Sequence, residues 1–221
     1  MKTSYYSLRM LGKLILLSIF VYYLFLMVII TLQYIPIDFT AAFLATKQDI
    51  IHNIHYQLSF FSHVYSSIII LIVGALQFSK YIRTKYSSLH RVLGYIYTFG
   101  ILCISAPAGF IMGFYGFGGL SATISFLLLS VLWFVFTLKA FLNARKKRYL
   151  IHQRYMILSY SLTLSAITLR LVKQILHIFS SLGRADIYVI ATWIGWILNL
   201  VIALFIVYAI NRKRTVKSMA S

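Results

Sequence analysis

Histidines are the residues of this sequence whose types and spacing are best suited to chemistry. Six occur, namely His52, His55, His63, His90, His152 and His177, whereas the chain has no glutamate and three aspartates. Hydrolysis by paired carboxylates or by a nucleophile with its base is therefore disfavoured. Imidazole nitrogen is a usual ligand of haem iron, and a bundle of helices can hold haem between facing members. The histidine pattern thus points to haem ligation.

His90 and His152 are the pair best placed for this role. Each is expected where a helix enters the membrane after a basic loop, so the two lie at one depth. A haem held by two histidines needs imidazoles at equal depth, on helices spread wider than the ~8–10 Å of direct packing. The alternative is that both imidazoles lie in the headgroup layer and bind lipid phosphate or water.

A second group of candidates is expected near the opposite membrane surface. His63 lies near the outer end of the second expected helix and His177 near the outer end of the fifth, so the two could pair. Arg170, Lys173 and His177 share one helix face. Arg170 could hold an anionic ligand near His63, or its side chain could extend outward to the membrane surface.

Transmembrane helices must position these residues. The sequence is 61% hydrophobic and 11% charged, whereas a soluble domain carries about a quarter charged residues. Apolar segments long enough to cross ~30 Å of hydrocarbon lie at about 14–33, 58–79, 92–113, 120–142, 155–178 and 187–210. The expected fold class is an all-α integral membrane bundle of six transmembrane helices, forming a single domain over residues 1–221.

The distribution of charge predicts the orientation of the chain. The net charge is +18, and most basic residues lie before the first span, after the sixth, and in the loops that follow spans two and four. By the positive-inside rule both termini are cytoplasmic, in the inner (plasma) membrane of the cell. The partner is the lipid bilayer, with no nucleic acid, because the basic residues alternate with apolar spans. A homodimer is possible.

An internal repeat relates two of the expected helical hairpins. A shift of 62 residues places His90 on His152 and aligns basic residues of the two loops. Spans two–three and four–five would then be parallel copies related by an axis along the membrane normal. The same shift places His63 on Ser125, so the outer side has one histidine of a potential pair.

Motifs in most of the chain resemble a known family. They are Gly74-x-x-Gln77-Phe78, Arg83, His90-Arg91-x-x-Gly94-x-x-Tyr97, Trp133, His152-x-Arg154-x-Met156 and Arg170. This set resembles a bacterial family of membrane proteins of unknown function (domain of unknown function 2306). The similarity runs from roughly His63 to Asn199 and implies no activity.

The layout more distantly resembles the ascorbate-dependent two-haem cytochrome b family of six-helix transmembrane ferrireductases. That family has histidines at the outer end of helix two, the inner start of helix three, the outer start of helix four and the inner start of helix five. His63, His90 and His152 match three of these positions. The fourth falls near residues 118–125, where no histidine occurs. The resemblance therefore implies an inner haem and leaves an outer haem without its second ligand.

The same resemblance implies roles for the basic residues around the inner pair. Arg83, Arg91 and Arg154 would bind haem propionates or an anionic reductant. As an alternative, these arginines only set topology by contact with anionic lipid.

Two functions from different classes follow. The first is a b-type cytochrome-like protein that binds one haem b near the cytoplasmic face, between His90 and His152, for electron transfer or quinol/ferric reduction. The alternative is a cofactor-free small transporter or an accessory membrane subunit, which the repeat and Arg170 fit. Against a transporter, the one candidate break in a span is Ala106-Pro107-Ala108-Gly109, which predicts a kink that neighbouring helices repair.

Overall fold

The computed structural model describes the backbone of residues 2–219 and the side chains of residues 10–212, and these residues form helices without strands. The elements are α1 (Lys2–Leu32), η1 (Ala42–Lys47), α2 (Ile54–Gln77), α3 (Lys80–Lys85), α4 (Ser87–Phe99), η2 (Gly100–Ser105), α5 (Ala106–Gly113), α6 (Gly119–Arg145), α7 (Tyr149–Thr163), α8 (Ser165–Phe179) and α9 (Arg184–Met219). The all-α prediction is confirmed.

The long apolar helices coincide with the expected spans. Within the described residues, five stretches are long and apolar enough to cross a membrane, namely Met10–Leu32, Ile54–Gln77, Ser87–Gly113, Gly119–Arg145 and Arg184–Arg212. Helices α7 and α8, which meet at an angle of 40°, add a sixth if the bent pair is counted as one span. The protein is therefore a multi-span membrane protein, and each of these helices coincides with a span expected from hydropathy.

Residues 1–51 form one compact unit. It consists of α1, a connecting segment and the short 3₁₀ helix η1. The Tyr34 hydroxyl accepts a hydrogen bond from the Phe43 amide at 3.2 Å, which ties the connection to η1. In the same segment the amide and hydroxyl of Thr40 both donate to the Asp38 carboxylate, at 2.8 and 2.7 Å. These two bonds favour the ionised carboxylate and lower the pKa of Asp38.

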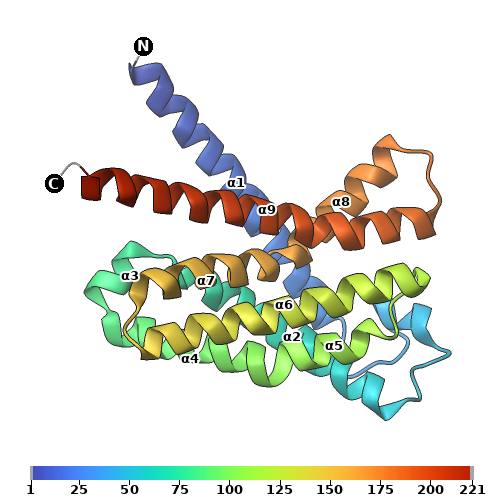
Figure 1. Ribbon diagram of the computed structural model, residues 1–221. Coiled ribbons are helices and arrows are strands. Elements are labelled where there is room, and N and C mark those ends of the chain that lie inside the picture. The colour runs from blue at the N-terminus through green and yellow to red at the C-terminus, as the bar shows by residue number, and fades with distance from the viewer. Residues whose placement is uncertain (1, 220–221) are drawn as a thin grey trace. The chain divides into compact units, whose positions relative to one another are not determined.

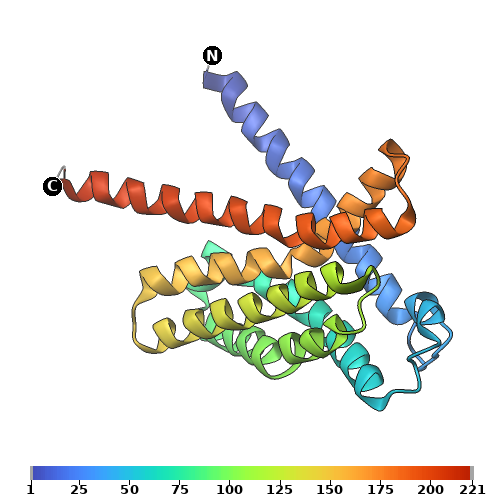
Figure 2. The same cartoon turned by 45° about the vertical axis from the view of Figure 1, so that its right-hand side comes forward.

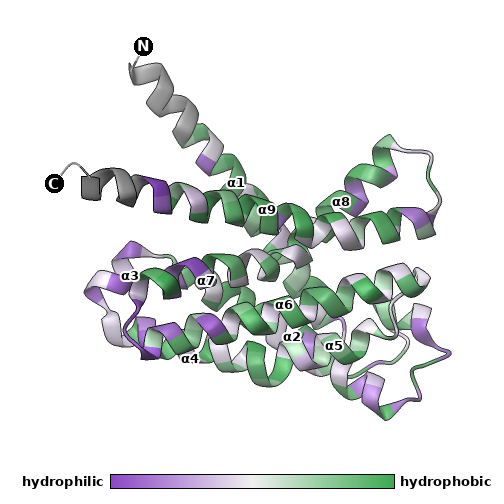
Figure 3. Ribbon diagram, viewed as in Figure 1, coloured by the Kyte–Doolittle hydropathy of each residue, from purple (hydrophilic) through white to green (hydrophobic). Residues whose placement is uncertain are grey.

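Residues 52–221 form a second unit built on a four-cornered bundle. The hairpin of α2 and α4, joined by α3, and the hairpin of α6 and α7 turn back at the same end (Figures 1 and 2). Helices α4 and α7 each pack on both α2 and α6. They therefore occupy diagonally opposite corners, and α2 and α6 occupy the other two. Hydrophilic residues gather at the end that carries α3 (Figure 3), which we call the basic end.

The ends of the helices follow local sequence rules. Asn53 caps α2, since its side-chain oxygen accepts from the amides of His55 and Tyr56 at 2.9 and 3.4 Å. Ser79 caps α3 in the same way through the amide of Ile82 at 3.3 Å. The turn before α6 contains Gly118, whose φ of +98° is in the left-handed region that glycine adopts without strain.

The third span contains a π-helix. Residues Gly100–Ser105 form η2 between α4 and α5, and Pro107 is the second residue after it. Proline has no amide hydrogen, so the regular hydrogen-bond ladder cannot continue through it. The kink predicted at Ala106-Pro107-Ala108-Gly109 thus takes the form of a change of helical register just before that stretch. Single π turns of this kind are frequent at functional sites.

The fifth span is bent where neither glycine nor proline occurs. The bend lies at Leu164, between α7 and α8. Around it, the hydroxyls of Ser161 and Ser165 donate to carbonyls three residues earlier at 2.8 and 2.5 Å, and the Thr163 hydroxyl donates to the carbonyl four residues earlier at 3.3 Å. Such bonds compete with the helix ladder and bend helices. Breaks were considered at glycine or proline alone, so this bend was not predicted from the sequence.

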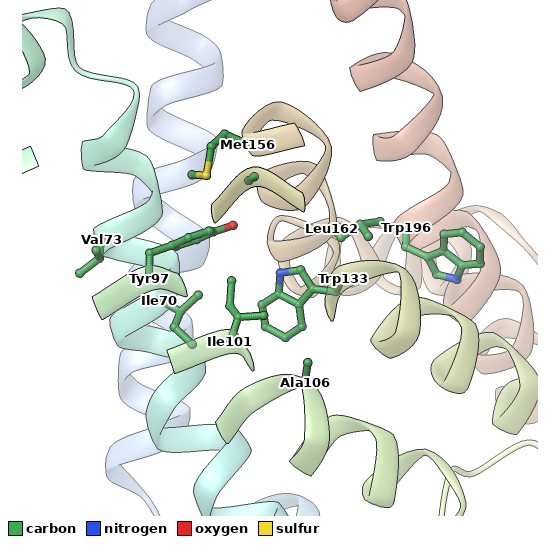
Figure 4. Packing of buried hydrophobic residues seen from close by; sticks show 10 residues of the cluster. Ile70, Val73, Tyr97, Ile101, Ala106, Trp133, Met156, Leu162 and Trp196 are labelled. Carbon is green, nitrogen blue, oxygen red and sulfur yellow. The ribbon is translucent and has the colours of Figure 1, made fainter. Parts of the chain in front are cut away.

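The core of the second unit combines apolar packing with polar tips. Figure 4 shows Tyr97 of α4 and Trp133 of α6 meeting near the middle of the buried cluster, among Ile70, Ile101 and Leu162. Tyr97 is wholly buried. Because lipid gives no hydrophobic drive between helices, small residues and hydrogen bonds hold such a bundle together.

Candidate functional site

His90 and His152 occupy equivalent places in their helices. Each is the fourth residue of its helix, α4 or α7. The His90 amide donates to the carbonyl of the N-cap residue Tyr86 at 3.0 Å, and the His152 amide donates to that of the N-cap residue Arg148 at 2.9 Å. The two N-cap residues also have similar ψ angles, of 59° and 64°. The local structure thus agrees with the 62-residue repeat.

The two histidines lie at one depth on facing sides of the bundle. Tyr97 follows His90 by seven residues, and Ser159 follows His152 by seven, which is two helical turns or about 10.5 Å. The Tyr97 and Ser159 hydroxyls are hydrogen-bonded across the bundle at 2.9 Å. Residues seven apart share a helix face, so both imidazoles are placed two turns nearer the basic end than this bond. They lie close enough for the charge of His152 to act on His90.

The hydrogen bond of the His152 side chain determines its tautomer. Nδ1 lies 2.9 Å from the carbonyl oxygen of Ala140 on α6. A carbonyl only accepts, so Nδ1 carries the hydrogen and Nε2 of the neutral ring carries a lone pair. Metal-binding histidines are oriented in this way by a second-shell carbonyl. Nδ1 of His90, by contrast, is buried with no hydrogen-bond partner among the described residues.

The three predicted arginines are placed differently. Arg83 on α3 is exposed, and its charge acts on His90. Arg154, two residues after His152, is half-buried, and its Nε has no hydrogen-bond partner in the described part of the chain. Arg91 is exposed on α4, and no contact links it to the histidines. Arg83 is thus the arginine whose charge reaches the pair, and Arg154 differs from the other two in being half-buried.

A buried hydroxyl network fills the bundle beyond the histidines. The Tyr97 hydroxyl bonds to Ser159 and to Thr163 at 2.9 and 3.0 Å, and the Trp133 ring nitrogen donates to Thr163 at 3.0 Å. Thr137 bonds to Ser159 at 2.7 Å. Sequence reasoning missed the serine and threonine members of this network. The available signal was the 62-residue shift, which aligns Tyr97 with Ser159.

Gly74 of the family motif is required by packing against this network. A Cβ atom at Gly74 would lie 2.5 Å from the Tyr160 ring and 2.7 Å from the Tyr97 ring. The Tyr160 hydroxyl also donates to the Leu71 carbonyl of α2 at 3.1 Å. Glycine therefore lets α2 approach the two tyrosines closely.

Gly94, in contrast, is not required by packing within the chain. It lies four residues after His90, between that histidine and Tyr97, on the side of α4 that faces the bundle. The nearest atom to a Cβ there would be Oε1 of Gln77, at an ordinary 3.6 Å. Gln77 in turn donates to the His90 carbonyl at 3.3 Å.

His63 lies in the half of the bundle remote from the basic end. Its Nδ1 lies 2.8 Å from the carbonyl oxygen of Ser105, the last residue of η2. Its ring meets Trp133 edge to face, with 6.4 Å between centroids. The charge of Arg170 on α8 acts on it. His177, the proposed outer partner, is exposed on α8, and nothing described places it beside His63.

Ser125, the repeat counterpart of His63, takes part in helix packing instead. Its buried hydroxyl donates to the Thr192 carbonyl of α9 at 3.0 Å and accepts from the Trp196 ring nitrogen at 2.9 Å. A third contact, from Thr168 to Asn199 at 3.0 Å, joins α8 to α9. The position equivalent to His63 thus serves to attach α9 to the bundle.

Comparison with known proteins gives one match. A family model described as "Predicted membrane protein (DUF2306)" matches residues 60–207. No curated protein and no solved structure matches the chain. The matched region contains the bundle, both histidines of the basic end and His63.

Proposed function

The chain belongs to the DUF2306 family of membrane proteins, and we propose that it binds one haem b between His90 and His152. It would act as a b-type cytochrome in the bacterial plasma membrane, in electron transfer or in quinol/ferric reduction. One observation carries the proposal: Tyr97 and Ser159, each two helical turns after its histidine, are hydrogen-bonded across the bundle, and the Nδ1–H of His152 is bound to a carbonyl. That is the second-shell arrangement of a metal-binding imidazole.

The spacing of the helices supports this proposal. Helices in direct contact lie about 8–10 Å apart, which is too close to admit a porphyrin edge between two axial imidazoles. Helices α4 and α7 each pack on both α2 and α6, and this diagonal arrangement supports a spread wider than that of directly packed helices.

The residues around the pair fit the group in chemistry. Nδ1 of His90 and Nε of Arg154 are buried polar atoms without partners among the described residues. Burial of such groups is costly unless a hydrogen bond compensates. A haem propionate is an acceptor for Arg154, and Arg83 adds positive charge nearby. At Gly94, on the helix face between His90 and Tyr97, an added Cβ would contact Oε1 of Gln77 at 3.6 Å and no other described side chain.

The chain's own residues would have separate tasks. His90 and His152 would hold the iron, and the Ala140 carbonyl would keep Nε2 of His152 directed and basic. The network of Tyr97 would close the bundle below the site and exclude lipid and water. Haem, when bound, supplies one-electron oxidation and reduction, with a potential set by its axial imidazoles. The electron donor would be a quinol or an anionic reductant.

The experiment is haem quantification by pyridine haemochrome on protein expressed with a haem precursor. We expect about one haem per chain in the wild type, and loss of low-spin haem in H90A and H152A. The matched control is H177A, which removes an exposed histidine of the same chain and should keep its haem. Full haem content in H152A would contradict the assignment.

A small transporter is the second candidate, favoured by the bend of the fifth span. Discontinuous transmembrane helices often form the substrate site of transporters, and Arg170 lies on α8 soon after the 40° bend. A flux that depends on Arg170 but not on His90 or His152 would favour this function over a cytochrome.

A further inference from the structure

The basic end carries a large positive charge that the bundle does not neutralise. Residues 80–91 and 139–154 together contain ten lysines and arginines, whereas residues 50–185 contain no aspartate or glutamate. Nine of these ten side chains are exposed, and Arg154 is the half-buried member. The connection through α3 and the turn between α6 and α7 both lie at this end (Figures 1 and 2). Because like charges repel, the basic end attracts anions from outside the bundle.

The charge is densest in the turn between α6 and α7. The four consecutive residues 145–148 are all basic and all exposed. Hydrogen bonds fix the backbone of this turn. The Lys147 amide donates to the Ala144 carbonyl at 3.0 Å. The Arg148 amide donates to the Asn143 carbonyl at 2.9 Å. These two bonds are the pair that defines a Schellman C-cap, so the four cations are held on one ordered turn.

Two of these cations occupy positions that are unfavourable for the fold itself. Lys147 has a φ of +57°, in the left-handed region that glycine usually occupies at this position of a C-cap. Arg148 is the N-cap residue of α7, where the helix dipole already contributes positive potential. The positive-inside rule asks for basic residues in such a turn, but not at these two positions. Their placement therefore indicates a use of the charge beyond topology.

Aromatic residues beside the turn are typical of the head-group level of a membrane. Tyr149, which directly follows the turn, is 66% exposed. The ammonium of Lys139, on the last turns of α6, lies 5.4 Å from the centroid of the Tyr155 ring. Tyrosine is enriched at membrane–water interfaces, and lysines near helix ends extend toward the same level. The turn is thus placed at the depth of lipid phosphates.

We propose that the turn formed by residues 145–148 binds the head-group phosphate of an anionic phospholipid. Its guanidinium and ammonium groups would donate hydrogen bonds to the phosphate oxygens, which are strong acceptors. A soluble phosphate offers the same oxygens, but the membrane depth of the turn favours a lipid. The proposal does not rest on haem binding, because Arg83 and Arg154, which are assigned to the haem, lie outside this turn.

The test is lipid titration of the full-length protein in detergent, read by native mass spectrometry. Dioleoyl-phosphatidylglycerol and dioleoyl-phosphatidylcholine have the same acyl chains and differ in net charge, and we expect the first to bind at least tenfold more tightly. Equal affinity of the wild type for the two lipids would overturn the proposal.

A matched pair of single substitutions locates the binding. K147N should weaken phosphatidylglycerol binding about fivefold, which corresponds to about 1 kcal/mol for one surface cation. Asparagine tolerates the left-handed conformation of this position, so the turn should persist. The control is R184Q, which removes an exposed cation where α9 begins, at the end remote from α3 (Figure 1). It should bind as the wild type does, and an equal loss in both variants would overturn the assignment to the turn.

K147G separates lipid binding from a structural role of the side chain. Glycine adopts the φ of this position without strain, so the unfolding temperature in detergent should be unchanged or higher. Phosphatidylglycerol affinity should nevertheless fall about fivefold. Wild-type affinity in K147G would overturn the proposal. Complete displacement of the lipid by millimolar inorganic phosphate would identify a site for a free anion and would also overturn it.

Discussion

Replacement of Gly74 by alanine tests the packing that joins α2 to the buried tyrosines. The added methyl would lie 2.5 and 2.6 Å from two atoms of the Tyr160 ring and 2.7 Å from the Tyr97 ring. Cβ atoms do not approach other atoms this closely, so both rings must move. The methyl therefore strains the hydrogen bonds of Tyr97 to Ser159 and Thr163, as well as that of Tyr160 to α2.

The expected magnitude follows from three effects. Overpacking costs about 1–3 kcal/mol, and each weakened hydrogen bond in a membrane bundle contributes about 0.6 kcal/mol. Alanine in place of a helical glycine raises the free energy of unfolding by about 1 kcal/mol, because it favours the helix. With three bonds weakened, the net loss for Gly74→Ala is therefore about 2–4 kcal/mol in the free energy of unfolding.

Gly94→Ala is the matched control, since it makes the same chemical change in a neighbouring helix of the bundle. Its methyl would meet only Gln77, at 3.6 Å, so in protein free of ligand the stability should be unchanged or raised by up to about 1 kcal/mol. The assay is equilibrium unfolding of the detergent-solubilised protein in mixed micelles with increasing SDS, followed by far-UV circular dichroism. Equal stability of the two variants would refute the packing argument.

Three further predictions concern the network, the bend and the first unit. Tyr97→Phe and Ser159→Ala should each lower the free energy of unfolding by about 1 kcal/mol, and a double-mutant cycle between them should give a coupling of about 0.6 kcal/mol; additive losses would show that the two hydroxyls are not bonded. Ser165→Ala should reduce the bend of the fifth span, because it removes a hydroxyl bond to a helix carbonyl; spin-label distances between α7 and α8 measure this, and an unchanged distance would place the cause elsewhere. Thr40→Ala should raise the pKa of Asp38 toward the usual value of about 3.9, since the native hydrogen bonds favour the carboxylate. At pH values above the pKa of this carboxyl in the unfolded chain, the native bonds stabilise the fold. This stabilisation is lost as the pH falls through the lower pKa that Asp38 has in the native state. Carboxyl NMR of protein labelled at aspartate measures this titration, and an unchanged Asp38 pKa would count against the bond from the Thr40 hydroxyl, the one that the substitution removes.

The spans were predictable from the sequence because the thickness of the bilayer imposes a minimum length on every apolar helix. The matched register of His90 and His152 was also predictable, since the 62-residue shift aligns the loops that precede them. The bend at Leu164 was not. It arises from hydroxyl groups that donate hydrogen bonds to carbonyls of their own helix. The sequence does not show which serines and threonines make such bonds.

The candidate site was likewise predictable from the sequence only in part. The equivalent helix positions of the two histidines followed from the repeat, whereas the Ala140 carbonyl that orients His152 comes from another helix and has no signature in the sequence. For the same reason, the distinction between Arg154, which is half-buried, and Arg91, which is exposed, required the fold. The cytoplasmic position of the termini and a homodimer stay predictions from charge and composition.

The measurement that tests the central proposal most directly is the dithionite-reduced minus air-oxidised absorption spectrum of the purified wild-type protein, expressed with a haem precursor. We predict a sharp α-band of low-spin haem b with two histidine ligands, at about one haem per chain. A featureless difference spectrum from well-folded protein would contradict the account.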